Sequence, residues 1–155
     1  MATGRKYLCT TLLLFMVGAM AAQGNGQDKI RLKDYQWKNR LILAFSPSTE
    51  NPGYRALEKD IAVQADEVVD RDLLVFQILE TGETKLGNSS LPESSGNYLR
   101  EKFSIKSDTF TVLLIGKDGG VKLRRQGGVE LDTIFSLIDT MPMRQREMRE
   151  KSQHK

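Results

Sequence analysis

Two apolar, strand-like runs flank a helical pattern in the first half of the chain. Residues 41–45 (LILAF) are all apolar and end before Pro47, as expected of a strand buried on both faces of a sheet. Residues 73–79 form a second, strand-like run that is apolar except for Gln77. Between the runs, apolar residues recur at helical spacings: Tyr54, Leu57, Ile61, Ala65 and Val68. Two strands joined by a helix predict a parallel pair with a right-handed crossover.

The second half of the chain predicts a helix and a hairpin. Residues 81–95 are rich in Gly, Ser and Asn, which predicts an irregular excursion, and a short helix is expected over 96–103. Residues 109–115 are strongly strand-like, and 117–120 (KDGG) are a turn signal because Asp-Gly tolerates positive φ. Residues 121–125 alternate apolar and basic side chains, which is typical of a half-exposed edge strand.

A closing helix follows the hairpin. Its apolar positions are Leu131, Ile134, Phe135, Ile138 and Met141. Pro142 interrupts this pattern, and residues 143–151 predict a charged helical continuation. The order β-α-β-(α)-β-β-α predicts one α/β domain over residues 37–151. Its mixed central sheet combines a βαβ unit with a β-hairpin and a basic C-terminal helix, and this topology resembles the thioredoxin superfamily.

The first 21 residues have the pattern of an export signal. Arg5 and Lys6 form a basic n-region, and the uncharged residues 8–20 lead to the small-x-small sequence Ala-Met-Ala. The apolar run is shorter than the roughly 20 residues that a membrane span needs. An uncleaved N-terminal anchor is the alternative interpretation. We expect export to the periplasm or outside the cell, a flexible lead-in over residues 22–36, and no stable membrane span after cleavage.

Removing the signal changes the charge and the cysteine content. The 155-residue chain has 23 basic and 20 acidic residues, and loss of Arg5 and Lys6 lowers the excess from +3 to +1. Binding to nucleic acid is therefore not expected. The only cysteine, Cys9, also leaves with the signal. The mature chain would then have no disulfide, no CxxC motif and no cysteine-based zinc site, and His154, in the tail, is its only histidine. We expect no metal and no cofactor.

Segments spread over residues 37–149 carry a family resemblance: WKNR at 37–40, Arg71-Asp72, LIGKDG at 114–119, IDTMPMR at 138–144 and EMR at 147–149. In these segments the chain resembles a peroxiredoxin-like family of largely unknown function. That family includes small exported bacterial proteins and domains of animal sushi-repeat-containing and Equarin-type matrix proteins. The resemblance implies a thioredoxin-like fold and export, and it implies no substrate.

The resemblance makes a set of motif positions candidate functional residues: Trp37, Arg40, Arg71, Asp72, Lys117, Asp118, Met141, Pro142, Met143, Arg144 and Glu147. For Trp37 we favour packing over the first strand rather than an exposed binding patch. The family pattern suggests that Arg40 pairs with a carboxylate such as that of Asp72. Asp70 and Asp72 flank Arg71, where a solvated charge cluster or a local ion pair is expected. Asp118 is interpreted as a turn residue rather than a metal ligand.

A redox protein of this superfamily needs a thiolate at the start of its first helix, where the helix dipole lowers the thiol pKa. The corresponding loop offers Ser48 and Thr49 but no cysteine, and their hydroxyls are far less acidic than a thiol. Phe110 falls near the position where redox members carry a cis-proline. We therefore expect no catalytic residue for thiol chemistry. Ser48, Thr49 and Asn51 either bind an anion or, as we favour, cap the helix, with Pro52 at its first position.

The basic C-terminal segment has two interpretations. In the first, it is an element that docks onto a partner or onto an anionic surface. Alternatively, and as we favour, it is a terminal helix that packs its methionines on the sheet, solvates its arginines, and pairs Glu147 with Lys151.

The leading functional hypothesis is an exported thioredoxin-like protein that binds a protein partner in the exported compartment and lacks a catalytic cysteine. The alternative is a non-thiol enzyme that uses Ser48 or Thr49 with Arg71 or Asp72. A pocket joining those side chains would favour the enzyme. A filled start of the first helix would favour the binding protein.

Overall fold

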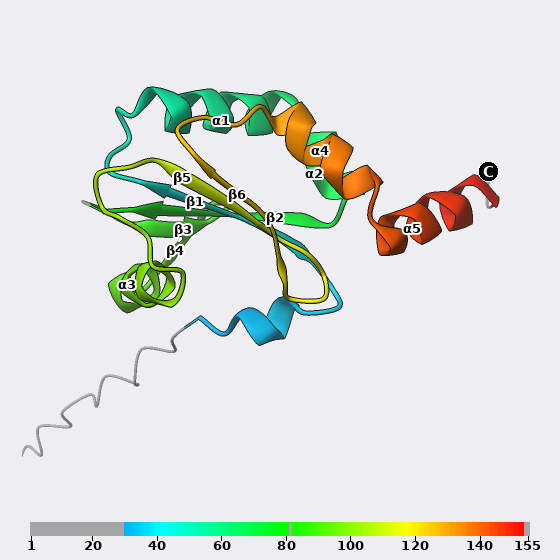
Figure 1. Cartoon of the computed structure of the whole chain (residues 1–155), viewed down its shortest axis with the longest axis horizontal. Helices are drawn as coiled ribbons and strands as arrows, with labels where there is room; N and C mark the ends of the chain where they lie inside the picture. Colours follow the sequence, from blue (N-terminus) through cyan, green and yellow to red (C-terminus); the bar gives the residue numbers. More distant parts are fainter. Residues whose placement is uncertain (1–29, 81, 154–155) are drawn as a thin grey trace, which may run out of the picture.

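A mixed six-stranded sheet with the strand order β4-β3-β2-β1-β5-β6 forms the centre of the domain (Figure 1). The computed structural model describes residues 30–80 and 82–153, so the predicted export signal at 1–21 lies outside the described residues. The elements are η1 (Leu32–Tyr35), β1 (Arg40–Ser46), α1 (Pro52–Val63), α2 (Ala65–Asp70), β2 (Leu73–Leu79), β3 (Thr84–Leu86), β4 (Ser89–Leu91), α3 (Glu93–Lys102), β5 (Thr111–Ile115), β6 (Val121–Gln126), α4 (Leu131–Asp139) and α5 (Pro142–Gln153).

The strand pairing confirms the predicted fold class. β1 and β2 are parallel, with Arg40 opposite Leu73 and Ser46 opposite Leu79. β5 is antiparallel to both β1 and β6. Every residue of β1 is buried, as its continuous apolar sequence predicts. The βαβ unit, the following hairpin and the closing helix together give the expected thioredoxin-like arrangement.

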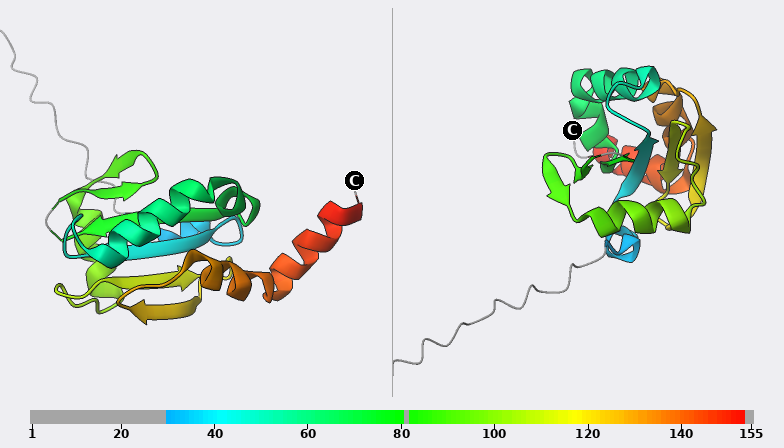
Figure 2. Two further views of the ribbon diagram at one scale, coloured as in Figure 1. Left: turned by 90° about the horizontal axis from the view of Figure 1, so that it is seen from above. Right: turned by 90° about the vertical axis from the view of Figure 1, so that its left-hand side faces the viewer.

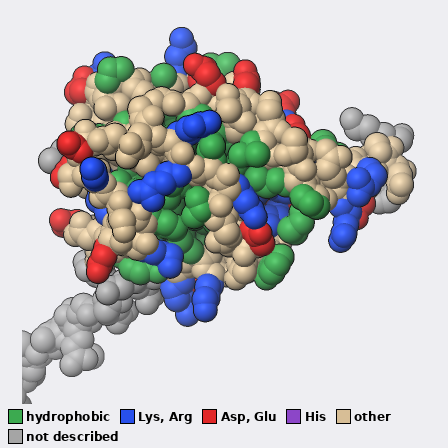
Figure 3. All heavy atoms as spheres, viewed as in Figure 1, with side chains coloured by type: hydrophobic (Ala, Val, Ile, Leu, Met, Phe, Trp, Pro, Cys, Tyr) green, Lys and Arg blue, Asp and Glu red, His purple; other side chains and the backbone are tan. Residues whose placement is uncertain are grey.

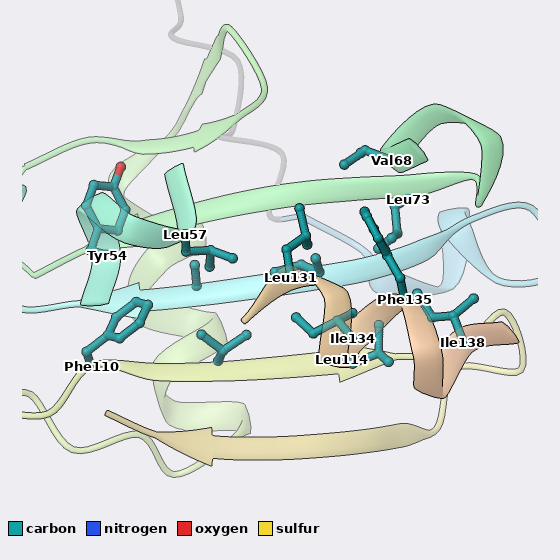
Figure 4. Close-up of a cluster of buried hydrophobic side chains, with 13 residues drawn as sticks. Tyr54, Leu57, Val68, Leu73, Phe110, Leu114, Leu131, Ile134, Phe135 and Ile138 are labelled. Carbon is teal, nitrogen blue, oxygen red and sulfur yellow. The ribbon is translucent and has the colours of Figure 1, made fainter. Parts of the chain in front are cut away.

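Helices cover both faces of the sheet (Figures 1 and 2). The core on the face of α1, α2 and α4 includes Leu57, Phe110 and Ile134, which Figure 4 shows between the helices and the strands. The core on the other face lies under α3 and η1 and includes Phe76 and Leu99. Because side chains alternate along β1, its residues divide between the two cores. α5 extends away from the end of the sheet.

Two segments differ from the prediction. The helix expected over residues 54–68 is divided at Gln64 into α1 and α2, and this break leaves Ala65 exposed. The excursion at 81–95 contains the hairpin of β3 and β4, which extends the sheet beyond β2. Gly87, with a φ of 55°, begins the two-residue turn between these strands.

The N-terminal boundary also lies earlier than expected. Ile30 is buried in the core beneath η1, and the ring of Tyr35 packs edge-on against Phe76 with centroids 5.6 Å apart. The packed structure therefore includes residues 30–36, which the sequence analysis placed in a flexible lead-in. Its earlier part, residues 22–29, lies outside the described residues.

Candidate functional site

The start of α1 is a capped helix end. The Oδ1 atom of Asn51 accepts hydrogen bonds from the backbone N–H groups of Gly53 (3.0 Å) and Tyr54 (3.2 Å), and Pro52 is the first helical residue. Ser48 and Thr49 also take part in local contacts. The Ser48 hydroxyl accepts from the N–H of Glu50 at 3.3 Å, and the Thr49 hydroxyl lies 3.5 Å from the Glu50 carboxylate. Asn51 therefore caps α1, whereas Ser48 and Thr49 make contacts with Glu50 and do not cap the helix.

Aromatic packing fills the space beside this helix start. The ring of Phe110 is buried and meets Tyr54 edge-on, with ring centroids 6.4 Å apart. A Cβ atom placed on Gly53 would lie 2.7 Å from Phe110 Cδ1 and 2.9 Å from the carbonyl oxygen of Gly127. All peptide bonds among the described residues are trans, including the one before Phe110. The space beside Gly53 at the start of α1 is thus filled by packed side chains.

The residues of the alternative enzyme site lie far apart. Ser48 and Thr49 follow the C-terminal end of β1, whereas Arg71 and Asp72 precede the N-terminal end of β2. Because the two strands are parallel and in register, these pairs stand at opposite ends of the sheet, roughly 20 Å apart along the strands. The prediction of an enzyme site that combines these two pairs of residues is therefore wrong.

Most of the predicted motif positions instead meet at the N-terminal end of β1 and β2. The cations among them are almost fully buried: the exposed fractions are 1% for Arg40, 8% for Arg71, 9% for Lys117 and 3% for Arg144. Burying a charge is unfavourable unless a counter-charge and hydrogen bonds accompany it. Carboxylates from four segments of the chain meet this requirement. We call these cations and their carboxylate partners the charge cluster.

Arg40 and Lys117 share the carboxylate of Glu147. Arg40 donates through both terminal nitrogens, with Nη1–Oε2 and Nη2–Oε1 distances of 3.1 Å each. Lys117 Nζ lies 2.8 Å from Glu147 Oε1 and 2.7 Å from Asp72 Oδ2. The suggested side-chain pair of Arg40 with Asp72 is therefore wrong, although the Arg40 N–H does donate to the Asp72 carbonyl at 2.9 Å.

Arg71 and Arg144 share Asp139 in the same way. Arg71 Nη2 lies 2.6 Å from Asp139 Oδ2, and Arg144 Nε lies 3.1 Å from Oδ1. Arg71 also stacks 4.4 Å from the centroid of the Phe135 ring. Asp70 accepts hydrogen bonds from Arg144 and, at 2.5 Å, from Lys151 Nζ. Arg71 does form a local ion pair, with Glu67 at an Nη1–Oε2 distance of 2.5 Å, but the arginine is buried and also belongs to the network around Asp139 rather than to a solvated cluster.

The charge cluster positions α5. Arg144 is the buried residue of this helix, whereas Met143 is 37% exposed. The favoured interpretation of the C-terminal segment, with methionines packed on the sheet and arginines in solvent, is wrong for these two residues. Glu147 and Lys151 also do not pair with each other, because each binds a partner outside α5. Ion pairs, rather than an apolar face, attach the helix to the domain.

The hairpin turn brings the remaining motif positions beside the charge cluster. Asp118 is a turn residue, as expected: its Oδ1 accepts from the Gly120 N–H at 3.1 Å, and its Oδ2 lies 2.6 Å from Lys122 Nζ. Trp37 donates its backbone N–H to the Lys117 carbonyl at 2.6 Å, but its side chain is 64% exposed. The favoured packing of Trp37 over the first strand is therefore wrong.

A cavity of about 130 Å³ lies between this turn and the start of α5. It is lined by Arg40, Gly116, Lys117, Asp118, Lys122 and the Met141-Pro142-Met143 segment. Hydrophobic side chains are exposed between the hairpin and the start of α5 in Figure 3. No group of three or more His, Cys, Asp or Glu side chains suited to a metal ion occurs among the described residues.

The family model described as "Domain of unknown function (DUF4174)" matches residues 31–147. The chain belongs to this family. Coiled-coil domain-containing protein 80 of Danio rerio is 27% identical over 133 residues, which cover 76% of this chain and 15% of that protein. The human sushi repeat-containing protein SRPX is 30% identical over 121 residues, with 76% and 26% covered. The chain thus spans about a quarter or less of these relatives, and the resemblance to sushi-repeat-containing proteins is confirmed.

Solved structures with this fold include redox proteins. The reduced 2-Cys peroxiredoxin of Plasmodium vivax has a TM-score of 0.54 at 13% identity, covering 76% of this chain and 85% of that one. The exposed lipoprotein thioredoxin Etrx1 of Streptococcus pneumoniae has a TM-score of 0.50 at 20% identity, with 72% and 91% covered. At these identities the likeness shows the fold alone. Within residues 30–80 and 82–153 of this DUF4174 domain, no helix is long and apolar enough to span a membrane.

Sequence reasoning found most cations of the charge cluster but missed some of their partners. Asp70 was expected only to flank Arg71 in a solvated charge cluster or a local ion pair, and Asp139, which lies inside the IDTMPMR segment, was not singled out. The signal that could have identified them is their place in or beside those motif segments. Their role depends on contacts between residues far apart in the chain, such as Arg71 with Asp139.

The cations lower the pKa values of the carboxylates in the charge cluster. Hydrogen bonds from Lys151 and Arg144 bring the pKa of Asp70 to about 2. Burial alone would raise the pKa of Asp139, but hydrogen bonds from Arg71 and Arg144 outweigh it and the pKa lies below its ordinary value. For Glu147, burial is likewise outweighed by hydrogen bonds from Arg40 and Lys117, which lower its pKa.

We expect the stability of this DUF4174 domain to fall in acid. A carboxylate with a lowered folded-state pKa stabilises the fold above its unfolded pKa of about 4, and that contribution is lost as the pH falls towards about 2. After allowance for solvent screening, Asp70 contributes about 1 kcal/mol. Urea unfolding of Asp70→Asn should show that loss at pH 7 and a weaker dependence on pH between 5 and 2.

The matched control for this measurement is Asp66→Asn, because Asp66 is an exposed residue of the same helix. It should keep both the stability and the pH dependence of the unmodified protein. Equal pH dependence in the unmodified protein and in Asp70→Asn would contradict the role given to Asp70.

The close packing beside Gly53 at the start of α1 leads to a second prediction. Gly53→Ala should lower the free energy of unfolding by about 1–2 kcal/mol, because overpacking against Phe110 and the Gly127 carbonyl outweighs the better helix propensity of alanine. Gly128→Ala is the control, since a Cβ there meets nothing within 4 Å. If urea unfolding shows Gly53→Ala to be as stable as Gly128→Ala, the space beside the helix start is not filled.

Proposed function

We propose that this DUF4174 domain is an exported protein that binds a protein partner and performs no thiol chemistry. The observation that carries the proposal is the start of α1. The only cysteine of the chain is Cys9, and the rings of Phe110 and Tyr54 pack beside Gly53 at the helix start. The scaffold of a redox protein is therefore present without the side chain that its chemistry requires.

Export rests on the sequence pattern of residues 1–21. Its basic n-region, uncharged apolar run and Ala-Met-Ala end are those of a cleaved signal. Cleavage after residue 21 would remove Cys9, so the exported protein would contain no cysteine for thiol chemistry.

The exposed surface at the hairpin end supports binding. Trp37 and Met143 are large hydrophobic side chains with exposed fractions of 64% and 37%. Trp37 is attached to the hairpin through the carbonyl of Lys117, and the charge cluster holds the helix that carries Met143. Aromatic and methionine side chains are enriched where proteins bind one another.

Photo-crosslinking in the exported compartment of the source cells tests the proposal. The full chain is compared with Trp37→Ala and with Val63→Ala, whose replaced side chain is 76% exposed on α1. We expect a discrete crosslinked protein that is lost with Trp37→Ala and kept with Val63→Ala. Equal crosslinking by both variants, or none by the unmodified chain, would contradict a partner at this surface.

The protein recovered from that compartment serves as its own chemical control. Its mass should correspond to an N-terminus near Ala22, and peroxidase and disulfide-reductase assays should give only background rates. An intact Met1 would contradict cleavage, and clear turnover would contradict the lack of thiol chemistry.

A further inference from the structure

Another cavity lies between η1, the end of α3 and the turn of the β5–β6 hairpin. Its volume is about 230 Å³. The apolar part of its lining consists of Leu32, Tyr35, Leu41, Phe103 and Ile115. All five belong to or pack against the core on the α3 face of the sheet. The inner surface of the cavity is therefore continuous with that core.

The volume and the aromatic lining decide the shape of molecule that this cavity accepts. An engineered apolar cavity of about 150 Å³ binds benzene. A volume of about 230 Å³ therefore has room for one benzene ring with a short side arm. Tyr35 and Phe103 supply aromatic surface, and aromatic rings pack well edge-on or offset against one another. The Tyr35 ring is itself held in place by Phe76, with centroids 5.6 Å apart.

Two exposed lysines without a carboxylate partner line the same cavity. Lys33 forms no ion pair and no side-chain hydrogen bond within residues 30–80 and 82–153. Lys102 Nζ lies 5.9 Å from the ring centroids of Tyr98 and Phe103, and no carboxylate of that part of the chain pairs with it. Lys and Arg side chains gather around η1 in Figure 3. The potential at this cavity therefore favours an anion.

The carboxylate in the lining does not cancel this preference. Asp118 is held by Lys122, with an Oδ2–Nζ distance of 2.6 Å, and accepts the Gly120 N–H at 3.1 Å. These hydrogen bonds lower the pKa of Asp118, so it stays ionised and paired. An anion in the cavity meets the unpaired ammonium groups of Lys33 and Lys102, whereas a cation would be repelled by them.

Hydrogen bonds hold the walls of the cavity in place. Gln36 Nε2 donates to the Asp118 carbonyl at 2.8 Å and joins η1 to the hairpin turn. The Arg124 guanidinium donates to the carbonyls of Phe103 (2.9 Å) and Ser104 (3.1 Å) and joins β6 to the end of α3. Because the walls are already fixed, a ligand does not have to order them on binding.

We propose that this cavity binds a small aromatic carboxylate. The ring of the ligand packs on the apolar lining, and its carboxylate pairs with the ammonium groups of Lys33 and Lys102. The inference goes beyond the proposed function, because the ligand is a small molecule and not the protein partner.

Nuclear magnetic resonance titration of the full chain with 3-phenylpropionate tests the proposal. We expect saturable shifts of the Tyr35 and Phe103 ring resonances and of the Leu32 and Ile115 methyl resonances. The methyl resonances of Leu131, in the core on the other face, should not move. The absence of saturable shifts at the cavity would overturn the proposal.

Three further probes separate the ring, the charge and the size of the ligand. 3-Phenylpropanamide lacks the charge and propionate lacks the ring, and each should bind at least about threefold more weakly than 3-phenylpropionate. Equal binding of either probe would overturn the corresponding contact. N-acetyl-alanyl-phenylalanine carries the same ring and carboxylate at the end of a peptide. Its binding at least as tightly as 3-phenylpropionate would assign the cavity to a protein C-terminus and overturn the small-molecule ligand.

A charge-neutralised variant tests the two lysines. The double change Lys33→Gln and Lys102→Gln should weaken 3-phenylpropionate binding at least about threefold and leave 3-phenylpropanamide binding unchanged, because the apolar lining is kept. Both side chains are exposed, so the variant should fold. Lys59→Gln, an exposed lysine of α1 on the opposite face of the sheet, is the matched control and should change neither affinity. Equal affinity of the double variant and the control for 3-phenylpropionate would overturn the carboxylate contact.

Discussion

The burial of cations at one end of the sheet is the constraint on which the arrangement of this domain depends. Arg40, Arg71, Lys117 and Arg144 are withdrawn from water, so each needs a carboxylate at hydrogen-bonding distance. Those carboxylates come from α2, from Asp72 directly before β2, and from α4 and α5. The helix α5 is mostly polar and has little apolar surface with which to attach itself. Its position therefore follows from the pairing of charges.

The two ends of the parallel strands have opposite characters. At the C-terminal end of β1, where members of the thioredoxin superfamily place their reactive cysteine, apolar packing and a capped helix leave the polar groups satisfied. At the N-terminal end, the charge cluster lies beside a cavity whose lining includes Met141, Pro142 and Met143.

Local patterns predicted the fold well because its main elements carry strong local signals. The apolar run of β1, the Asp-Gly turn and the helical spacing in α4 each specify their structure within a few residues. The hairpin of β3 and β4 was missed because three-residue strands are too short to show alternation. Its Gly87-Asn88 turn was the available signal.

The candidate site was predicted as a set of residues but not as a set of contacts. Motif resemblance selected Arg40 and Glu147, which are 107 positions apart, without indicating that they bind each other. The sequence also did not indicate that the Trp37 side chain is exposed. Its φ of 65° and the hydrogen bond from its backbone N–H to the hairpin arise only in the folded chain. Contacts of this kind depend on how the helices and strands are arranged in the fold, and the spacing of residues along the sequence does not predict that arrangement.

Amide hydrogen exchange of α5 tests most directly whether charge pairing holds this helix. The comparison uses the unmodified protein, Glu147→Ala, and Glu150→Ala as a matched change of an exposed residue in the same helix. The account predicts that Glu147→Ala accelerates exchange in α5 by about tenfold or more while α4 stays protected, and that Glu150→Ala changes neither. Equal exchange rates of α5 in all three proteins would contradict it.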